Sequence, residues 1–330
     1  MKFIKFFSMA LCATMALSFA SCSDDDDNDD NSGVKAPTTQ DTGNYSQFGE
    51  PVLASEAGRY TITDEQSPYA SIELTESGRY VILPQYYRNY TPMAKKSVRI
   101  MKFFGIQSRA DDVQTGSYTK IGENEYLLEG FGTITITGSS TEACEIVITL
   151  EDGTETTVGA QPEEVFATDP ITLALCRSWK SSELRMRVSV NGSIVTDQRA
   201  AINNLNSMLS NMARDMYNWA KKHNMLDEDD TIEDYEVDAP EIADEAIFTK
   251  AGSYLLLKDG QLAYSIWAWN DMSKGMLHYS HNVQNLFDPY FSNDATISFD
   301  DKNMVAYEFT EDSEDGLTVK YETWSYFVEL

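Results

Sequence analysis

The chain has 330 residues, of which 42% are hydrophobic and 12% aromatic. This composition supplies enough apolar surface for packed cores and, at this length, predicts about two globular domains. The formal net charge is −28 at pH 7, which excludes nucleic acid as an expected partner, because a phosphate backbone is bound by clustered Lys and Arg. Beyond the first residues no apolar run approaches the roughly 20 residues that a membrane-spanning helix needs.

The first 21 residues have the plan of a secretory signal. Lys2 and Lys5 precede an apolar run from Phe6 to Leu17, and small residues follow. The segment Leu17-Ser18-Phe19-Ala20-Ser21-Cys22 resembles the lipobox of bacterial lipoproteins. The resemblance implies cleavage before Cys22 and a membrane anchor of lipids on that cysteine. The alternative is an ordinary cleaved signal in which Cys22 is incidental.

Residues 22–47 read as an acidic, solvated tether. The run Ser23-Asp24-Asp25-Asp26-Asp27-Asn28-Asp29-Asp30 repels itself and has no apolar surface to bury. An acidic run just after a lipidated cysteine resembles the surface-export signal of Bacteroidetes lipoproteins, which implies a lipid-anchored protein of the outer membrane, exposed at the cell surface. The alternative is a plain spacer, with the protein on the periplasmic face.

From residue 48 onward, short alternating runs separated by turn signals predict a mainly β fold. In the first half we expect strands at Thr133–Thr137, Glu145–Leu150 and Thr154–Val158, with Asp152-Gly153 as a hairpin turn. In the second half, expected strands cover these runs: Tyr254–Leu257, Leu262–Trp269, Gly275–Tyr279, Ala295–Phe299, Met304–Phe309 and Leu317–Val328. We therefore predict two antiparallel β-barrel or meander domains, residues 48–162 and 163–330.

A faint internal repeat supports two related domains. Ile72–Ile82 aligns with Ala246–Leu256, 174 residues later, through the shared pattern Thr-x-x-Gly-x-Tyr. The second copy carries an insertion, residues 197–224, that reads as an amphipathic helix from about Gln198 to His223 after the N-cap candidate Asp197. We expect this helix to close one end of its own barrel. The alternative is a movable lid over a ligand cavity.

The second half also resembles a known family. Leu175-Cys176-Arg177-Ser178-Trp179-Lys180, the inserted helix and Phe248–Tyr254 together are similar to the lipocalin-like lipoproteins of Bacteroidetes, over residues 170–330. The resemblance implies a lipocalin-like barrel in which Trp179 takes the place of the tryptophan in the lipocalin Gly-x-Trp motif. Arg177 stands where that motif has glycine.

Aromatic residues are the candidate ligand contacts. Trp267 and Trp269 share one face of a predicted strand, and Trp179 and Tyr254 lie in the segments that resemble the lipocalin-like family. Such residues form either a core or a platform for a sugar or apolar ligand. We predict a binding or interaction module for a small apolar or glycan ligand. The alternative is a structural or accessory subunit that contacts an outer-membrane protein.

The chain carries few signals of catalysis. His278 and His281 have no further ligands at a metal spacing, and no recognised nucleophile or phosphate-loop motif is present, so we predict no metal, no cofactor and no enzyme. A glycan hydrolase is the third alternative. Two carboxylates suffice for it, and nothing in the sequence selects Glu163 or Asp271 from the 53 acids.

Two further questions stay open at this point. Cys144 and Cys176 could pair or stay as buried thiols. The basic segment from Arg88 to Arg109, which is rich in aromatic residues, is expected to dock on an acidic surface of the second domain or of a partner.

Overall fold

The computed structural model describes residues 57–89, 113–138, 142–163, 169–228, 230–235, 242–258, 261–280, 286–287, 292–300, 303–314 and 316–330. The predicted signal peptide, Cys22, the acidic tether and the basic segment beyond residue 89 lie outside these residues. No helix in the described ranges is both long enough and apolar enough to span a bilayer.

The fold is mainly β, with two closed antiparallel barrels and one long helix, as predicted. The first barrel consists of β1 (Gly58–Ile62), β2 (Tyr69–Leu74), β3 (Arg79–Pro84), β4 (Gln114–Gly122), β5 (Glu125–Leu128), β6 (Gly132–Thr137), β7 (Cys144–Leu150) and β8 (Glu155–Pro162). Each strand pairs with the next, and β8 returns to β1. A short 3₁₀ helix, η2 (Gln85–Asn89), follows β3.

The local reason for this meander is the alternation of inward and outward residues. Along β6 and β7 every second side chain is buried, so one face of each strand lines the barrel. The predicted turn at Asp152-Gly153 is confirmed. Gly153 has a φ of +83° and donates its N–H to Leu150 O at 2.9 Å, and Asp152 accepts from Thr154 N at 2.8 Å.

The second barrel is larger and more elaborate. Its elements are α2 (Pro170–Leu175), β9 (Ser178–Val190), β10 (Ser193–Ala201), η4 (Ile202–Asn204), α3 (Leu205–Lys222), η5 (Ile232–Tyr235), β11 (Glu245–Phe248), β12 (Ser253–Lys258), β13 (Gln261–Asp271), η6 (Met272–Lys274), β14 (Met276–Ser280), β15 (Ser292–Asp300), β16 (Asn303–Glu314) and β17 (Leu317–Glu329). The pairing of β17 with β9 closes β9 and β11–β17 into a barrel, which leaves β10 outside the ring.

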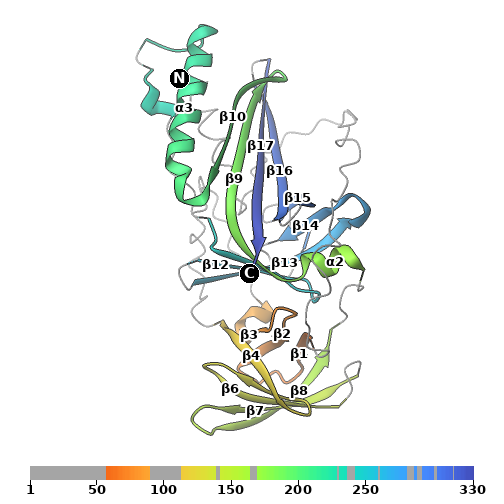
Figure 1. Ribbon diagram of the computed structural model, residues 1–330. Coiled ribbons are helices and arrows are strands. Elements are labelled where there is room, and N and C mark those ends of the chain that lie inside the picture. Colours follow the sequence, from red (N-terminus) through yellow and green to blue (C-terminus); the bar gives the residue numbers. More distant parts are fainter. Residues whose placement is uncertain are drawn as a thin grey trace.

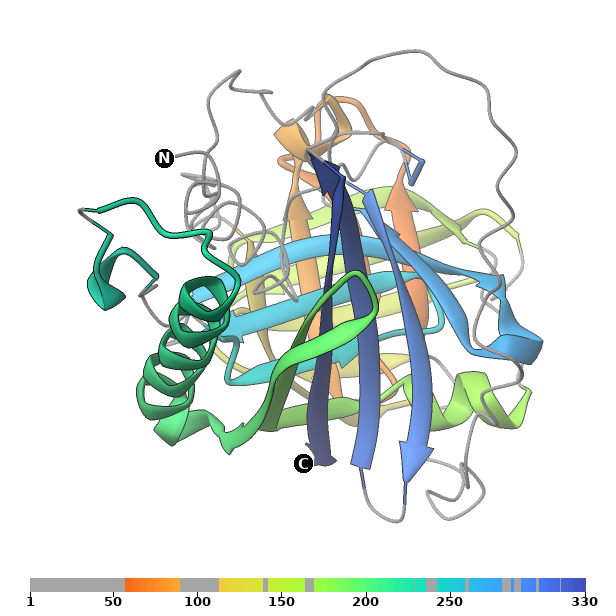
Figure 2. The same cartoon turned by 90° about the horizontal axis from the view of Figure 1, so that it is seen from above.

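One long strand explains why β10 is left outside. Along the same edge of β9, residues 178–180 pair with β11, whereas residues 183–190 pair with β10. The sheet of β10, β9, β17 and β16 therefore extends beyond the barrel, and α3 lies beside β10 in both views (Figures 1 and 2). Apolar residues of α3, including Met208 and Met212, pack with Met186 and Tyr321 of the sheet.

The predicted start of the helix was wrong. Residues 198–201 belong to β10, and α3 begins at Leu205. The reason is that Asp197 does not cap a helix. Its carboxylate binds the guanidinium groups of Arg185 at 2.7–2.8 Å and Arg187 at 2.8–2.9 Å, and these contacts hold Asp197 in the strand.

The two barrels meet through equivalent hairpins. The repeated segments form β2–β3 and β11–β12, which are the second and third strands of their barrels. Gly78 and Gly252 have φ angles of +75° and +81° at equivalent places in the two turns. Outward-facing side chains of both hairpins, among them Val81, Ile247 and Leu255, share one apolar cluster between the barrels.

Candidate functional site

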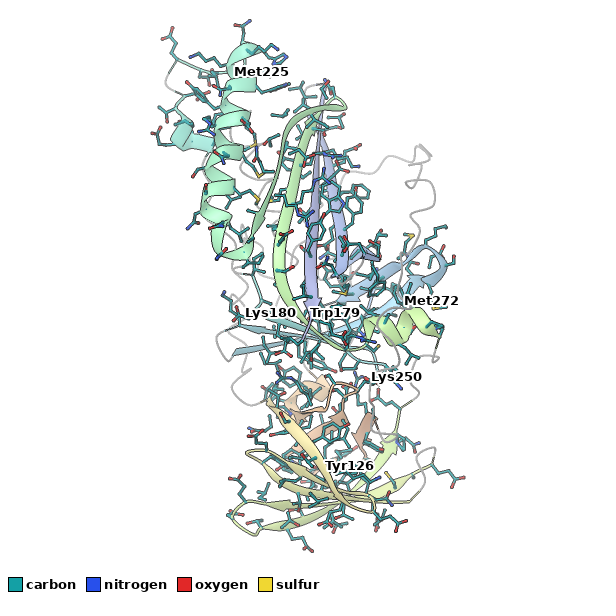
Figure 3. The ribbon with its side chains drawn as sticks, in the orientation of Figure 1. Tyr126, Trp179, Lys180, Met225, Lys250 and Met272 are labelled. Carbon is teal, nitrogen blue, oxygen red and sulfur yellow. The ribbon has the colours of Figure 1, made fainter. Side chains whose placement is uncertain are left out.

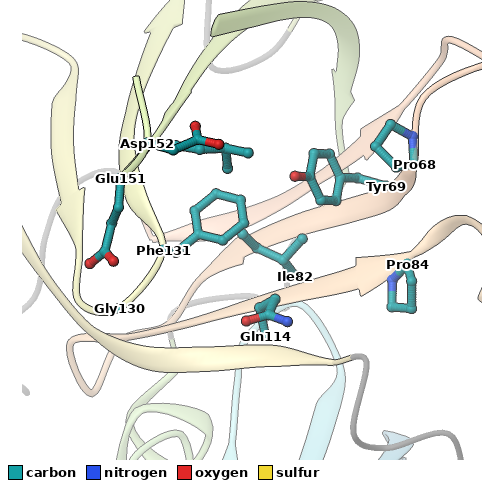
Figure 4. A pocket seen from close by; sticks show the side chains of 10 residues that line it. Pro68, Tyr69, Ile82, Pro84, Gln114, Gly130, Phe131, Glu151 and Asp152 are labelled. Carbon is teal, nitrogen blue, oxygen red and sulfur yellow. The ribbon is translucent and has the colours of Figure 1, made fainter. Parts of the chain in front are cut away.

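An open pocket lies at one end of the first barrel (Figure 4). Its volume is about 500 Å³, within the range of roughly 300–1,000 Å³ that is common for small-molecule sites. The residues that line it are Pro68, Tyr69, Ile82, Pro84, Gln114, Gly130, Phe131, Leu150, Glu151 and Asp152.

Strand ends and turns bring these residues together. Tyr69 begins β2 and pairs with Pro84 at the end of β3, so both stand at the same rim. The turn before β6 and the turn after β7 complete the rim, because Glu151 donates its N–H to Phe131 O at 3.2 Å. Gly132 permits this approach. A Cβ atom at position 132 would lie 2.1 Å from Thr149 O, and the φ angle of Gly132 is +141°.

Aromatic rings form one wall of the pocket. The rings of Tyr69 and Phe131 meet edge to face, with centroids 5.9 Å apart, and the centroid of the buried Tyr80 ring lies 6.2 Å from that of Phe131. Ile82 is buried beneath them. Burial raises the pKa of the Tyr69 phenol, so at neutral pH this hydroxyl is uncharged and can donate or accept a hydrogen bond.

Carboxylates form the rim. Glu151 and Asp152 line the pocket and are exposed, as is Glu129, which directly precedes Gly130 of the lining. Hydrogen bonds, first of all from the Thr154 N–H, lower the pKa of Asp152, so its side chain is ionised at neutral pH. Burial raises the pKa of Tyr80, and the negative charges of Glu129 and Glu151 raise it further. The Tyr80 hydroxyl donates to Glu129 O at 2.9 Å.

The aromatic residues predicted as ligand contacts lie in the second barrel instead. Trp179 is 0% exposed, Trp267 2% and Tyr254 3%, and Trp269 is half-buried against the same core. None of the four lines the pocket in the first barrel. Their ligand-binding role stays a prediction.

Each indole N–H of this group has a partner inside the protein. Trp179 Nε1 donates to Leu175 O at 2.9 Å, and Trp267 Nε1 donates to Thr249 O at 3.1 Å. Trp269 Nε1 donates to the Thr172 hydroxyl at 2.9 Å. These aromatic side chains, which the sequence suggested as a platform for a ligand, therefore pack in the core of the second barrel.

The junction between the barrels holds a buried polar cluster. Glu73 accepts from Arg59 Nε at 3.2 Å and from the hydroxyls of Ser253 and Thr249 in the other barrel. Arg59 also binds Glu163 at 3.1 Å. Figure 3 shows Lys250 at this junction, where its ammonium faces Glu76. The cluster joins the barrels and leaves its charges paired.

Other chemistry-bearing residues are engaged structurally. Glu163 binds Arg59, and Asp271 binds Lys274 at 2.7 Å. His278 lies 2.7 Å from Asp294, whereas His281 is outside the described residues. Within the described ranges no group of three His, Cys, Asp or Glu side chains suits a metal ion.

The cysteine alternatives are resolved in the structure. Cys144 and Cys176 are both free and buried, in the first and second barrel respectively.

Fold and site together define a two-barrel β protein with an aromatic, acid-rimmed pocket in its first barrel. No protein-family model and no curated protein matches the chain. Among solved structures it is similar to Transferrin Binding Protein B, a vaccine antigen from Haemophilus parasuis Hp5, at 8% identity and a TM-score of 0.18. The similarity covers 84% of this chain and 65% of the other chain. This chain therefore spans less than two thirds of the length of that Transferrin Binding Protein B chain. A likeness this weak carries no argument about the ligand.

Proposed function

We propose that this chain is an exported binding lipoprotein that captures a small ligand at the mouth of its first barrel. The second barrel serves as a packed structural domain. The observation that carries the proposal is the contrast between the barrels. The first has an opening of about 500 Å³ lined by Phe131 and Tyr69, whereas the candidate aromatic residues of the second lie in its core.

The lining favours a glycan unit over a fatty chain. A sugar ring can stack its apolar face on Phe131 or Tyr69. Its hydroxyl groups can donate hydrogen bonds to the carboxylates of Glu151 and Asp152. A fatty acid would bring its own carboxylate to this acidic rim, where like charges repel. The glycan reading therefore fits both the wall and the rim.

The rim also supports binding rather than hydrolysis. Glycoside hydrolysis requires two carboxylates on opposite sides of the bond that is cut. Glu151 and Asp152 are adjacent residues of one turn at one side of the opening (Figure 4). We propose a non-catalytic role on this ground.

Location completes the proposal. The lipobox-like segment ending at Cys22 and the acidic tether support lipid anchoring at the outer membrane, with the barrels held away from the bilayer at the cell surface. A binding lipoprotein placed there could deliver its ligand to an outer-membrane protein partner.

Calorimetric titration of the full chain tests the ligand site. The chain is purified in a polyoxyethylene detergent, which brings neither a sugar nor an ammonium group, and is titrated with mono- and oligosaccharides and with a short fatty acid. We expect at least one saccharide to bind and Phe131→Leu to weaken its binding about fivefold, since an aromatic contact contributes around 1 kcal/mol.

The matched control is Phe287→Leu, because Phe287 is exposed and lies outside the first barrel. It should leave the affinity unchanged. Saccharide binding that is insensitive to Phe131→Leu would place the site elsewhere. No binding by any ligand class would favour the alternative role as a structural or accessory subunit, which the filled second barrel suits.

A further inference from the structure

The rim of the pocket carries negative charge, and none of the described residues that line the pocket is basic. Glu151 and Asp152 line the pocket on one turn, and Glu129 directly precedes Gly130 of the lining. Among the ion pairs of the described residues, none involves these three carboxylates. The ten lining residues include no Lys, Arg or His.

Several other acids of the described residues are paired with basic side chains. At the barrel junction Glu73 and Glu76 each have a basic partner, Arg59 and Lys250 respectively. On the second barrel Asp197 is shared by two arginines. These three carboxylates are paired within the chain, whereas no ion pair of the described residues involves Glu151 or Asp152.

Aromatic faces beside these carboxylates add a second attraction for cations. A positive charge within about 6 Å of a ring centroid is attracted by the ring quadrupole, and the attraction grows when the site is partly desolvated. In Figure 4 the ring of Phe131 lies between Tyr69 on one side and Glu151 on the other, and Asp152 lies above it. A cation in the pocket would have both aromatic and carboxylate groups around it.

We infer that the pocket selects ligands that carry a positive charge, namely organic ammonium compounds such as amino sugars. This inference rests on the proposed function and specifies its ligand. The net charge of −28 supports it, because the field of an acidic protein draws cations towards an acid-rimmed opening and repels anions.

Two matched ligand pairs separate charge from shape. Glucosamine and N-acetylglucosamine share one ring and differ in the ammonium group. Choline and 3,3-dimethylbutanol share one shape and differ in charge. Each is titrated into the full chain in polyoxyethylene detergent. We expect the cation of at least one pair to bind about tenfold more tightly than its neutral partner and to weaken as salt is raised.

Variants then assign the charge effect to the rim. Glu151→Gln should weaken the cation about three- to fivefold, as expected for one exposed carboxylate, and weaken the neutral partner less, because the glutamine oxygen can still accept a hydrogen bond from a hydroxyl. Asp152→Asn should act similarly, because asparagine can keep the turn bond to Thr154 N. The control Glu145→Gln lies at the opposite end of β7 and should change neither ligand.

The outcomes distinguish the two proposals. If cation and neutral partner bind alike in both pairs, or if Glu151→Gln leaves the cation's affinity intact, charge selection is wrong while the pocket can still be a glycan site. If none of these four probes binds and no saccharide or fatty acid does either, the proposed binding function fails with it.

Discussion

Glu76 and Lys250, which occupy the same position of the repeated hairpin 174 residues apart, face each other across the junction of the two barrels. Lys250 Nζ lies 3.6 Å from one carboxylate oxygen of Glu76, and the Lys250 N–H donates to the other at 3.2 Å. Each barrel thus presents the same hairpin to its neighbour. The opposite charges at this shared position make the contact between the copies attractive.

Removing the lysine should destabilise the protein in a pH-dependent way. Burial raises the pKa of Glu76 to about 7, so the side chain is largely neutral at pH 5 and ionised at pH 8. Lys250→Met leaves that ionised carboxylate without its cation. We expect a loss of about 1–3 kcal/mol in the free energy of unfolding at pH 8 and a smaller loss at pH 5, measured by urea denaturation. Lys274→Met removes an exposed ion pair and serves as the control. Equal losses at both pH values would show that Lys250 does not act through Glu76.

Loss of Glu73 should weaken the junction more severely. Its carboxylate joins Arg59 to Ser253 and Thr249 of the other barrel, and all of these side chains are largely buried. Glu73→Ala removes one partner of the Arg59 charge and the carboxylate that accepts from the Thr249 and Ser253 hydroxyls. We predict a destabilisation of about 3–5 kcal/mol in a urea titration.

Two variants control for this effect. Glu73→Gln keeps one acceptor oxygen, for one of the two hydroxyls, and should show a smaller loss. Glu65→Ala changes an exposed acid of the same barrel and should be close to neutral. A Glu73→Ala chain as stable as Glu65→Ala would mean that the polar cluster does not hold the barrels together.

Glu308 provides a second pH-dependent prediction, inside the second barrel. Burial raises its pKa from 4.5 to about 7, although the Tyr279 hydroxyl donates to its carboxylate at 2.6 Å. The folded protein therefore holds the proton to a higher pH than the unfolded chain, and stability falls as pH rises from about 4.5 to about 7. Glu308→Gln stays neutral throughout.

The variant should match the parent protein at low pH and exceed its stability at pH 8, by on the order of 3 kcal/mol at most. Urea denaturation at pH 5 and pH 8 measures the difference. Glu311→Gln, at an exposed position of the same strand, should show no such gain. A Glu308→Gln protein that is less stable than the parent at pH 8 would contradict this account of the buried carboxylate.

Substitution of Trp267 should lower the stability of the protein without changing its affinity for saccharide. The side chain is 2% exposed, donates to Thr249 O and meets Phe248 edge to face with centroids 5.9 Å apart. Trp267→Ala should cost about 3–5 kcal/mol of stability, while the fraction that remains folded keeps its affinity for saccharide. Trp219→Ala, at a half-buried position of α3, should destabilise less. Saccharide affinity lost in a folded Trp267→Ala protein would instead support the site predicted in the second barrel.

The hairpins could be predicted from the sequence because their signals are local. Alternation and the Asp152-Gly153 turn indicated β6 to β8, and the shared Thr-x-x-Gly-x-Tyr pattern indicated two related hairpins. The start of α3 could not be predicted. Asp197 has the chemistry of an N-cap, and only the arrival of Arg185 and Arg187 from the neighbouring strand places it in β10.

The site was harder to predict because it also depends on contacts between residues that are distant in the sequence. Tryptophans are conspicuous in a sequence, but the sequence does not tell whether barrel closure buries Trp179 and Trp267 or exposes them. The pocket residues Tyr69 and Phe131 lie far apart in the chain and share no local pattern. They meet because the rim of a closed barrel brings strand ends and turns together.

Hydrogen exchange of the full chain with and without saturating glucosamine tests the central claim, that the first barrel holds the ligand site. Binding should slow amide exchange in residues 129–132 and 150–153, at the two turns of the rim, and leave β12 and β13 of the second barrel unchanged. Protection confined to the strands around Trp267 and Tyr254, with no change at the rim, would contradict the account and return the site to the second barrel.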